Sequence, residues 1–377
     1  GMWLYWSIAC LLVTAFATSS AALMILRVNL NFEPGDSFDT LIKSTLGRGW
    51  NIFNGLLFVF LLYILDYAYI SGGGSIVSQT SVSLCGVELP HVVASLVFAI
   101  SLAFVVWLST AAVSKVTAVF LFGMIVSFIL VMFDLSFTIN WSRFTAANAV
   151  ENDTPRFYYV FAALPFYLTS FTFTSVVPSL VAYYGKRYTT ISRSILIASL
   201  GCLIIYLVFL LVSLGNVPQT EFREVSAAGG NIGDLLEVLM GGSASTLLSI
   251  FANAAIISSF LAVSLGLFDF IKDRFDFDNS KTGRFKTALI SFMPPIVGGV
   301  FFPDGFLHAI GFAGLVLAIN ALIIPPLMIK KSKQQFKEAD HGGFVGSNFV
   351  IHTVIALGVF YASCHILAML NLLPVYK

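Results

Sequence analysis

The stretch Tyr158–Tyr184, YYVFAALPFYLTSFTFTSVVPSLVAYY, decides how the rest of the chain is interpreted. It is apolar enough to enter a bilayer, yet Pro165 and Pro178 each remove a backbone donor and disfavour an uninterrupted helix. The hydroxyl side chains between the two prolines are able to satisfy backbone groups that a break would free. Two interpretations stay open: a helix broken near its middle, as transporters use to bind substrate and ions, or a proline-kinked but continuous helix.

The composition is that of an all-α polytopic membrane protein. Of the 377 residues, 58% are hydrophobic and only 10% are charged, and the mean hydropathy is +0.91. Long uncharged apolar runs recur from end to end, and the alternating strands of about ten residues that build a membrane β-barrel are not seen in the sequence. The net charge of +1 gives no electrostatic basis for binding nucleic acid.

Apolar runs predict ten spans in a single transmembrane transporter domain over residues 1–377. The predicted spans cover residues 3–26, 51–70, 91–113, 116–137, 158–184, 194–214, 243–270, 287–302, 306–329 and 348–370. A tight connection is expected at Lys115, between the third and fourth spans.

The basic residues predict the orientation. Alternate connections on one side hold 16 of the 20 Lys and Arg residues, and only Arg143, Arg156, Arg223 and Lys377 lie on the other. By the positive-inside rule the first side is cytoplasmic, so both termini of this chain are expected to face outward. Because the chain begins Gly1-Met2-Trp3 at an outward end, either a helix is expected upstream or Gly1 is a cloning remnant.

Asp66 is the carboxylate that lies deep inside a predicted span, in LLYILDYAYISGGG. A charge in mid-membrane is costly and normally pairs or lines a water-filled path. The functional interpretation is proton coupling or binding of a substrate ammonium. The structural alternative is a carboxyl that is protonated or hydrogen-bonded to Tyr63 or Tyr69.

Two further polar clusters lie in spans. Ser71-Gly72-Gly73-Gly74 either lets a ligand or helix approach closely or, as we expect, ends a helix, since glycine favours that position. Ser258-Ser259, with Asn253, are the polar residues in the middle of the seventh predicted span. The oxygens of these residues coordinate a cation or face the broken helix; for the serines the alternative is a bond back to their own helix.

No catalytic or metal-binding set is found in the sequence. The five histidines form no cluster, the four cysteines are scattered, and HExxH, GxSxG and paired-carboxylate arrangements are absent. We therefore expect neither an enzyme nor a bound cofactor or metal.

Several stretches together resemble the aromatic amino acid permeases, the bacterial tyrosine and tryptophan permeases of the amino acid/polyamine/organocation superfamily, with the tyrosine permeases most similar. The residues that carry the resemblance are Ala68–Gly72, Thr169–Phe171, Phe173, Val177–Ser179, Ser259–Leu261, Leu265–Asp269, Pro294-Pro295, Phe301–Phe306 and Ala321–Pro325. No single motif is specific, but they occur in order through nearly the whole chain.

The resemblance implies a LeuT-like fold of two inverted five-helix repeats, with ten spans present of an expected eleven. It implies import of an aromatic amino acid, tyrosine foremost, across the bacterial inner membrane, driven by a proton rather than by sodium. Tyr158–Tyr184 would be the broken sixth helix, whose carbonyls near Ser170 suit the substrate ammonium. The implied substrate-binding residues are Thr169, Ser170, Phe171, Thr172 and Phe173, together with Tyr69, Ser258 and Ser259, and Phe171 and Phe173 would lie near the aromatic ring.

The sequence departs from the family in two ways. Gly1 aligns with the end of the family's Gly-rich first helix, which would supply donors for the substrate carboxylate. Family members carry a lysine in the span corresponding to 116–137, where this chain has Met124. Asp66 is hypothesised to take part of that coupling role. The alternative function is a transport-incompetent fragment or a non-transporting binding or sensing relative with the same fold.

Overall fold

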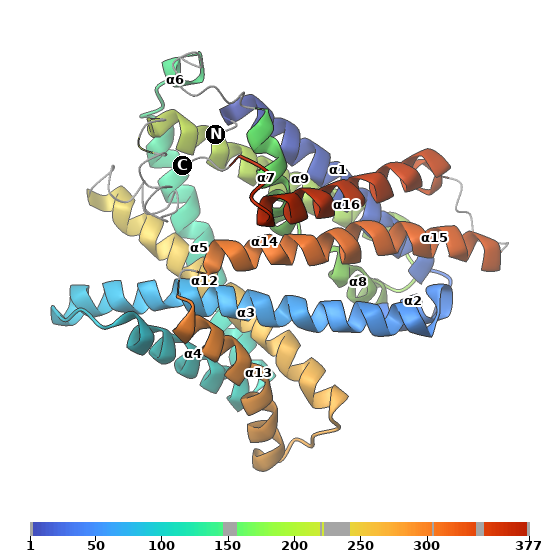
Figure 1. Cartoon of the computed structure of the whole chain (residues 1–377), viewed down its shortest axis with the longest axis horizontal. Helices are drawn as coiled ribbons and strands as arrows, with labels where there is room; N and C mark the ends of the chain where they lie inside the picture. Colours follow the sequence, from blue (N-terminus) through green and yellow to red (C-terminus); the bar gives the residue numbers. More distant parts are fainter. Residues whose placement is uncertain are drawn as a thin grey trace. The chain divides into compact units, whose positions relative to one another are not determined.

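The computed structural model describes residues 3–145, 157–218, 221, 242–303, 305–336 and 343–374, and within these ranges the regular structure is helical, with no strand (Figure 1). The chain divides into two compact units. Unit 1 consists of Gly1–Phe58, Ala149–Leu211 and Gly311–Tyr376, and unit 2 of Val59–Asn148, Val212–Ile310 and Lys377.

Helices lie over each of the intervals that the sequence predicts as spans. The longer helices are α1 (Trp3–Asn29), α3 (Arg48–Cys85), α4 (His91–Leu108), α5 (Thr110–Ser136), α7 (Tyr158–Ser170), α8 (Val177–Tyr184), α9 (Tyr188–Asn216), α12 (Gly242–Arg274), α13 (Lys281–Phe301), α14 (Phe306–Leu317), α15 (Ile324–Gln335) and α16 (Asn348–Met369). The shorter elements are α2 (Phe38–Leu46), α6 (Ser142–Thr145), the 3₁₀ turns η1 (Thr174–Val176) and η3 (Phe344–Gly346), and the π-helical turn η2 (Ala318–Ile323).

Among the described residues, nine helical stretches are long and apolar enough to cross a bilayer, as a multi-pass membrane protein requires. α13, which lies over the predicted eighth span, is not one of the nine. Its first turns carry Lys281, Arg284 and Lys286, which lower its hydropathy. The count of ten spans therefore stays a prediction.

In unit 1, α1 is the central helix and packs against α7, α8, α15 and α16. Its small and hydroxyl-bearing residues let other helices approach on several sides. The buried Thr14 hydroxyl lies 2.6 Å from the Tyr361 hydroxyl of α16, and the Ser19 hydroxyl lies 2.6 Å from that of Ser199 in α9. These bonds satisfy buried polar groups and fix the helices in register.

The π-helical turn η2 joins α14 to α15 because two prolines follow it. Pro325 and Pro326 have no backbone N–H, so the usual helical bonds to the carbonyls four residues earlier cannot form. The helix widens, and the Ile324 N–H bonds the Ile319 carbonyl five residues back. Within this turn the buried Asn320 side chain donates to the Asn54 side-chain oxygen at 2.7 Å.

In unit 2, α12 packs against α5 and α13, and α13 packs against α4. The core contains Phe260 with its ring centroid 5.4 Å from that of Phe98 and 6.3 Å from that of Phe292. Aromatic rings of three helices therefore meet at one point, which holds α4, α12 and α13 together.

The chain turns between α4 and α5 at Ser109, rather than at Lys115 as the sequence suggested. The Ser109 hydroxyl accepts from the Ala112 N–H at 3.0 Å and caps α5. Arg284 of α13 caps the other side, donating to the carbonyls of Trp107 at 2.8 Å and Val106 at 3.0 Å. Lys115 lies within α5, because hydroxyl capping and not charge sets where the helix begins.

Candidate functional site

The helix over 158–184 is broken, which excludes the continuous, kinked alternative (Figure 1). α7 ends at Ser170, and the backbone from Phe171 to Phe173 is not helical before η1 and α8 follow. Neither proline lies in the break. Pro165 is inside α7, and Pro178 lies in the first turn of α8, where a missing N–H costs no helical bond.

Hydroxyl side chains bond the backbone around the break, as the sequence predicted. Thr169 Oγ1 donates to the Pro165 carbonyl at 3.0 Å, and Ser170 Oγ donates to the Phe166 carbonyl at 3.1 Å. Thr172 Oγ1 reaches back to the Thr169 carbonyl at 2.5 Å. A carbonyl at a helix end has no helical partner and needs one from elsewhere, and here the neighbouring threonine supplies it.

The residues predicted to bind substrate at the break differ in exposure. Ser170 and Thr172 are exposed, whereas Thr169 and Phe173 are half-buried. Phe171 is 2% exposed and packs with Leu11 and Ala15 of α1. Phe171 therefore anchors the break within unit 1, and its contact with a substrate ring stays a prediction.

Tyr206 of α9 also reaches the break, and sequence reasoning missed it. Its hydroxyl donates to the Ser170 carbonyl at 2.5 Å. Its ring lies edge-on to Phe171, with centroids 5.2 Å apart and planes at 81°. The only indication in the sequence is a phenol within the apolar run LIIYLVFL, where a buried hydroxyl needs a hydrogen-bond partner.

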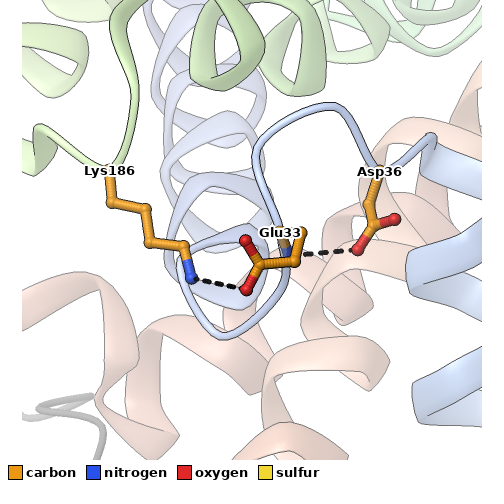
Figure 2. A network of polar contacts seen from close by, with 3 residues as sticks. All are labelled: Glu33, Asp36 and Lys186. Atoms are coloured by element: carbon orange, nitrogen blue, oxygen red, sulfur yellow. Dashed lines mark hydrogen bonds and ion pairs between the residues drawn. The ribbon is translucent and has the colours of Figure 1, made fainter.

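The end of α8 is capped by a glycine and lies beside an exposed ion pair. Gly185 has φ of 71°, a conformation that other residues avoid, and its N–H caps α8 on the Val181 carbonyl. Next to it, Lys186 Nζ lies 3.8 Å from a Glu33 carboxylate oxygen, and the Glu33 N–H donates to Asp36 (Figure 2). These contacts tie the second half of the broken helix to the segment that follows α1.

Asp66 of α3 lies in unit 2 and is fully buried. Its Oδ1 accepts from Ser264 Oγ of α12 at 2.9 Å, and its Oδ2 has no partner among the described residues. The structural alternative had two forms: the bond to Tyr63 or Tyr69 is not what the structure has, and the protonated carboxyl stays a prediction. Tyr63 donates to the Ile290 carbonyl at 3.0 Å, and the Tyr69 hydroxyl lies beside Ser259.

The two predicted serines of α12 have different surroundings. Ser258 Oγ donates to the Ala255 carbonyl at 3.2 Å, which is the bond back to its own helix that the sequence left open. Ser259 instead lies beside the Tyr69 hydroxyl of α3. In unit 2 the structure therefore brings together Asp66 with Ser264, and Tyr69 with Ser259, along the same pair of helices.

The glycine run at Gly72–Gly74 does not end a helix, so this expectation is wrong. α3 continues to Cys85, and Gly73 and Gly74 lie against α4. A Cβ on Gly73 would lie 2.5 Å from the Phe98 ring, and one on Gly74 would lie 2.2 Å from Ser95 Oγ. The glycines thus permit close helix packing, which was the other interpretation.

In the described ranges no three His, Cys, Asp or Glu side chains gather in a way that would hold a metal ion. What the described groups offer is polar chemistry: carbonyls and hydroxyls at the break, and a buried carboxyl with serine and tyrosine hydroxyls in unit 2. Such groups bind and orient a solute or a proton.

Solved structures place this fold among the LeuT-like transporters. One neighbour is MhsT in complex with L-phenylalanine, with a TM-score of 0.58 and 14% identity, covering 98% of this chain and 92% of that one. Another is Mhp1, a nucleobase-cation-symport-1 family transporter, with a TM-score of 0.55 and 14% identity over 99% of this chain and 86% of that one. The LeuT-like expectation is confirmed, and the class of protein that the fold defines is a multi-pass membrane protein of LeuT-like architecture.

The chain belongs to the tryptophan/tyrosine permease family, which it matches over residues 1–365. It is 45% identical to the tryptophan-specific transport protein of Pseudomonas aeruginosa, covering 100% of this chain and 91% of that protein. It is 38% identical to the low affinity tryptophan permease of Escherichia coli, over 99% and 91% of the two chains. It is 36% identical to the tyrosine permease of Enterobacter agglomerans, over 100% and 92%. The resemblance found in the sequence is confirmed.

Proposed function

We propose that this protein is a secondary active transporter that imports an aromatic amino acid across the bacterial inner membrane. The observation that carries the proposal is the break at Phe171–Phe173, in a chain of the tryptophan/tyrosine permease family. α7 ends there with its carbonyls at an exposed Ser170. The negative end of a half-helix is suited to the ammonium that every amino acid carries.

The ring of the substrate is expected to be an indole or a phenol. The sequence alone suggested tyrosine first. The identity is higher to a relative named tryptophan-specific, at 45%, than to one named tyrosine permease, at 36%. We therefore place tryptophan ahead of tyrosine and make the order an outcome of the competition assay below.

Proton symport is the proposed coupling, with Asp66 as the proton-binding group. A symporter needs a buried group that gains and loses a proton as access alternates between the two sides. Asp66 is fully buried, bonds Ser264 through one oxygen and leaves the other without a partner among the described residues. An intramembrane carboxyl of this kind is a functional candidate by default.

The test is uptake of labelled tryptophan by the full-length protein in proteoliposomes. An inward proton gradient should drive accumulation, and a protonophore should abolish it, whereas a sodium gradient alone should not support it. Unlabelled tryptophan, tyrosine and phenylalanine are then compared as competitors, and tryptophan should compete best.

Each outcome decides between the candidates. Uptake driven by sodium alone would refute the proton assignment, and stronger competition by tyrosine would reverse the substrate order. Binding of aromatic amino acids without uptake, by protein shown to be folded, would favour a non-transporting binding or sensing relative.

A further inference from the structure

The carbonyls freed at the end of α7 are satisfied in two different ways. The Leu168 carbonyl accepts from the Phe171 N–H at 3.1 Å, and the Thr169 carbonyl accepts from Thr172 Oγ1 at 2.5 Å. Both donors lie in the broken segment itself. The Ser170 carbonyl instead accepts from the Tyr206 hydroxyl, which belongs to α9. A bond within the segment moves with it, whereas a bond from another helix fixes the carbonyl to the rest of unit 1.

Tyr206 holds the break through its ring as well as its hydroxyl. The ring meets the edge of Phe171, and both belong to one apolar cluster with Leu11 and Ala15 of α1. Adjacent residues of the break, Ser170 and Phe171, are therefore both held by one side chain. Ser170 is exposed while Phe171 is buried, so the contact fixes which way the Ser170 carbonyl points.

We propose that Tyr206 is a positioning residue for substrate binding. Its hydroxyl uses one lone pair of the Ser170 carbonyl and orients the oxygen, and the second lone pair is left for the ammonium of the amino acid. The inference rests on the proposed function, because the ammonium is that of the transported substrate. Tyr206 itself is assigned no contact with the substrate.

The test compares Tyr206→Phe with Tyr361→Phe in the full-length protein. Tyr206→Phe keeps the ring on Phe171 and removes only the hydroxyl. Tyr361→Phe is the matched control, because it removes a buried hydroxyl bonded to Thr14 at 2.6 Å in the same unit but away from the break. Loss of one hydrogen bond that orients the ligand group should raise the KM for tryptophan about 3- to 10-fold, with Vmax within twofold. Tyr361→Phe should leave KM within twofold.

A second readout depends on the ammonium. Indole-3-propionate has the indole ring and the carboxylate but no ammonium, so its inhibition constant should not change in Tyr206→Phe. Equal weakening of tryptophan and indole-3-propionate would overturn the proposal, and so would an unchanged KM for tryptophan. If indole-3-propionate fails to inhibit the unmutated protein, the KM comparison with Tyr361→Phe decides alone.

A third readout needs no substrate and separates this proposal from the proposed function. Amide hydrogen exchange over residues 168–176 should speed up at least several-fold in Tyr206→Phe and stay unchanged in Tyr361→Phe. An unmutated protein that takes up no aromatic amino acid would refute the proposed function. If the unmutated protein takes up no substrate, faster amide exchange in Tyr206→Phe would support only the contact by which Tyr206 keeps residues 170 and 171 in place. Unchanged exchange in Tyr206→Phe would overturn the role of Tyr206 as well.

Discussion

Replacing Gly314 by alanine tests how α14 packs against the first half of the broken helix. A Cβ on Gly314 would lie 2.4 Å from the Pro165 carbonyl oxygen and 2.8 Å from the carbonyl carbon. A Cβ atom does not approach another heavy atom within 3.0 Å, and the atoms it would meet here are backbone, so no side chain can turn away. The two helices would have to separate by most of an ångström.

The expected loss of stability follows from two opposing effects. Overpacking of this kind costs about 1–3 kcal/mol. Alanine recovers up to about 1 kcal/mol through its higher helix propensity. With a mid-range overpacking cost of about 2 kcal/mol the net loss is about 1–2 kcal/mol, which corresponds to a fall in melting temperature of a few degrees.

The assay is thermal unfolding in detergent, with Gly201→Ala as the control. A Cβ on Gly201 of α9 meets no atom within 4 Å, so this variant should be as stable as the parent or slightly more stable. Pro165 lies in the helix that ends at Ser170, so Gly314→Ala should also weaken substrate binding. A melting temperature for Gly314→Ala that matches Gly201→Ala would refute the close approach.

Three further substitutions have distinct expected outcomes. Asp66→Asn should abolish gradient-driven uptake but leave the exchange of labelled for unlabelled substrate, and Ser264→Ala should reduce uptake less than Asp66→Asn does. Full pH-gradient-driven uptake by Asp66→Asn would show that Asp66 is not the coupling group. Arg284→Ala should lower stability by about 3 kcal/mol in the same thermal assay, because two carbonyls lose a charged donor. Arg284→Lys should recover only part of that stability. An unchanged melting temperature for Arg284→Ala would contradict the capping role. Lys186→Ala should change stability by less than about 1 kcal/mol, because its ion pair with Glu33 is largely solvent-exposed, and a larger loss would show that this pair holds α8 in place.

Local pattern in the sequence was enough to find the helices and to make a break in residues 158–184 one of two open interpretations. Long apolar runs are strong indicators, and the hydroxyl-rich stretch between Pro165 and Pro178 indicated that the backbone there could do without helical bonds. The exact place of the break was not predictable. It lies at residues 171–173, away from both prolines: Pro178 lies in the first turn of α8, and Pro165 stays inside α7 although its missing N–H removes a helical bond.

Features that depend on contacts between distant segments were missed. Ser264 is 198 residues from Asp66, and Tyr206 is 36 residues from Ser170. Nothing local distinguishes these hydroxyls from others in the spans. The glycine run was misread for the same reason, since the need for glycine comes from Phe98 of the facing helix.

Arg284 has a consequence for how the protein is made. It lies 177 residues after Trp107, whose carbonyl it caps. At about 5–20 residues per second, a ribosome needs roughly 10 to 35 seconds to reach it after completing α4. During that interval the end of the α4–α5 hairpin has to be capped by water at the membrane surface, because a carbonyl without a partner is not tolerated in lipid. The end of the α4–α5 hairpin is therefore expected to stay at the interface with its carbonyls bonded to water until α13 is inserted and Arg284 replaces that water.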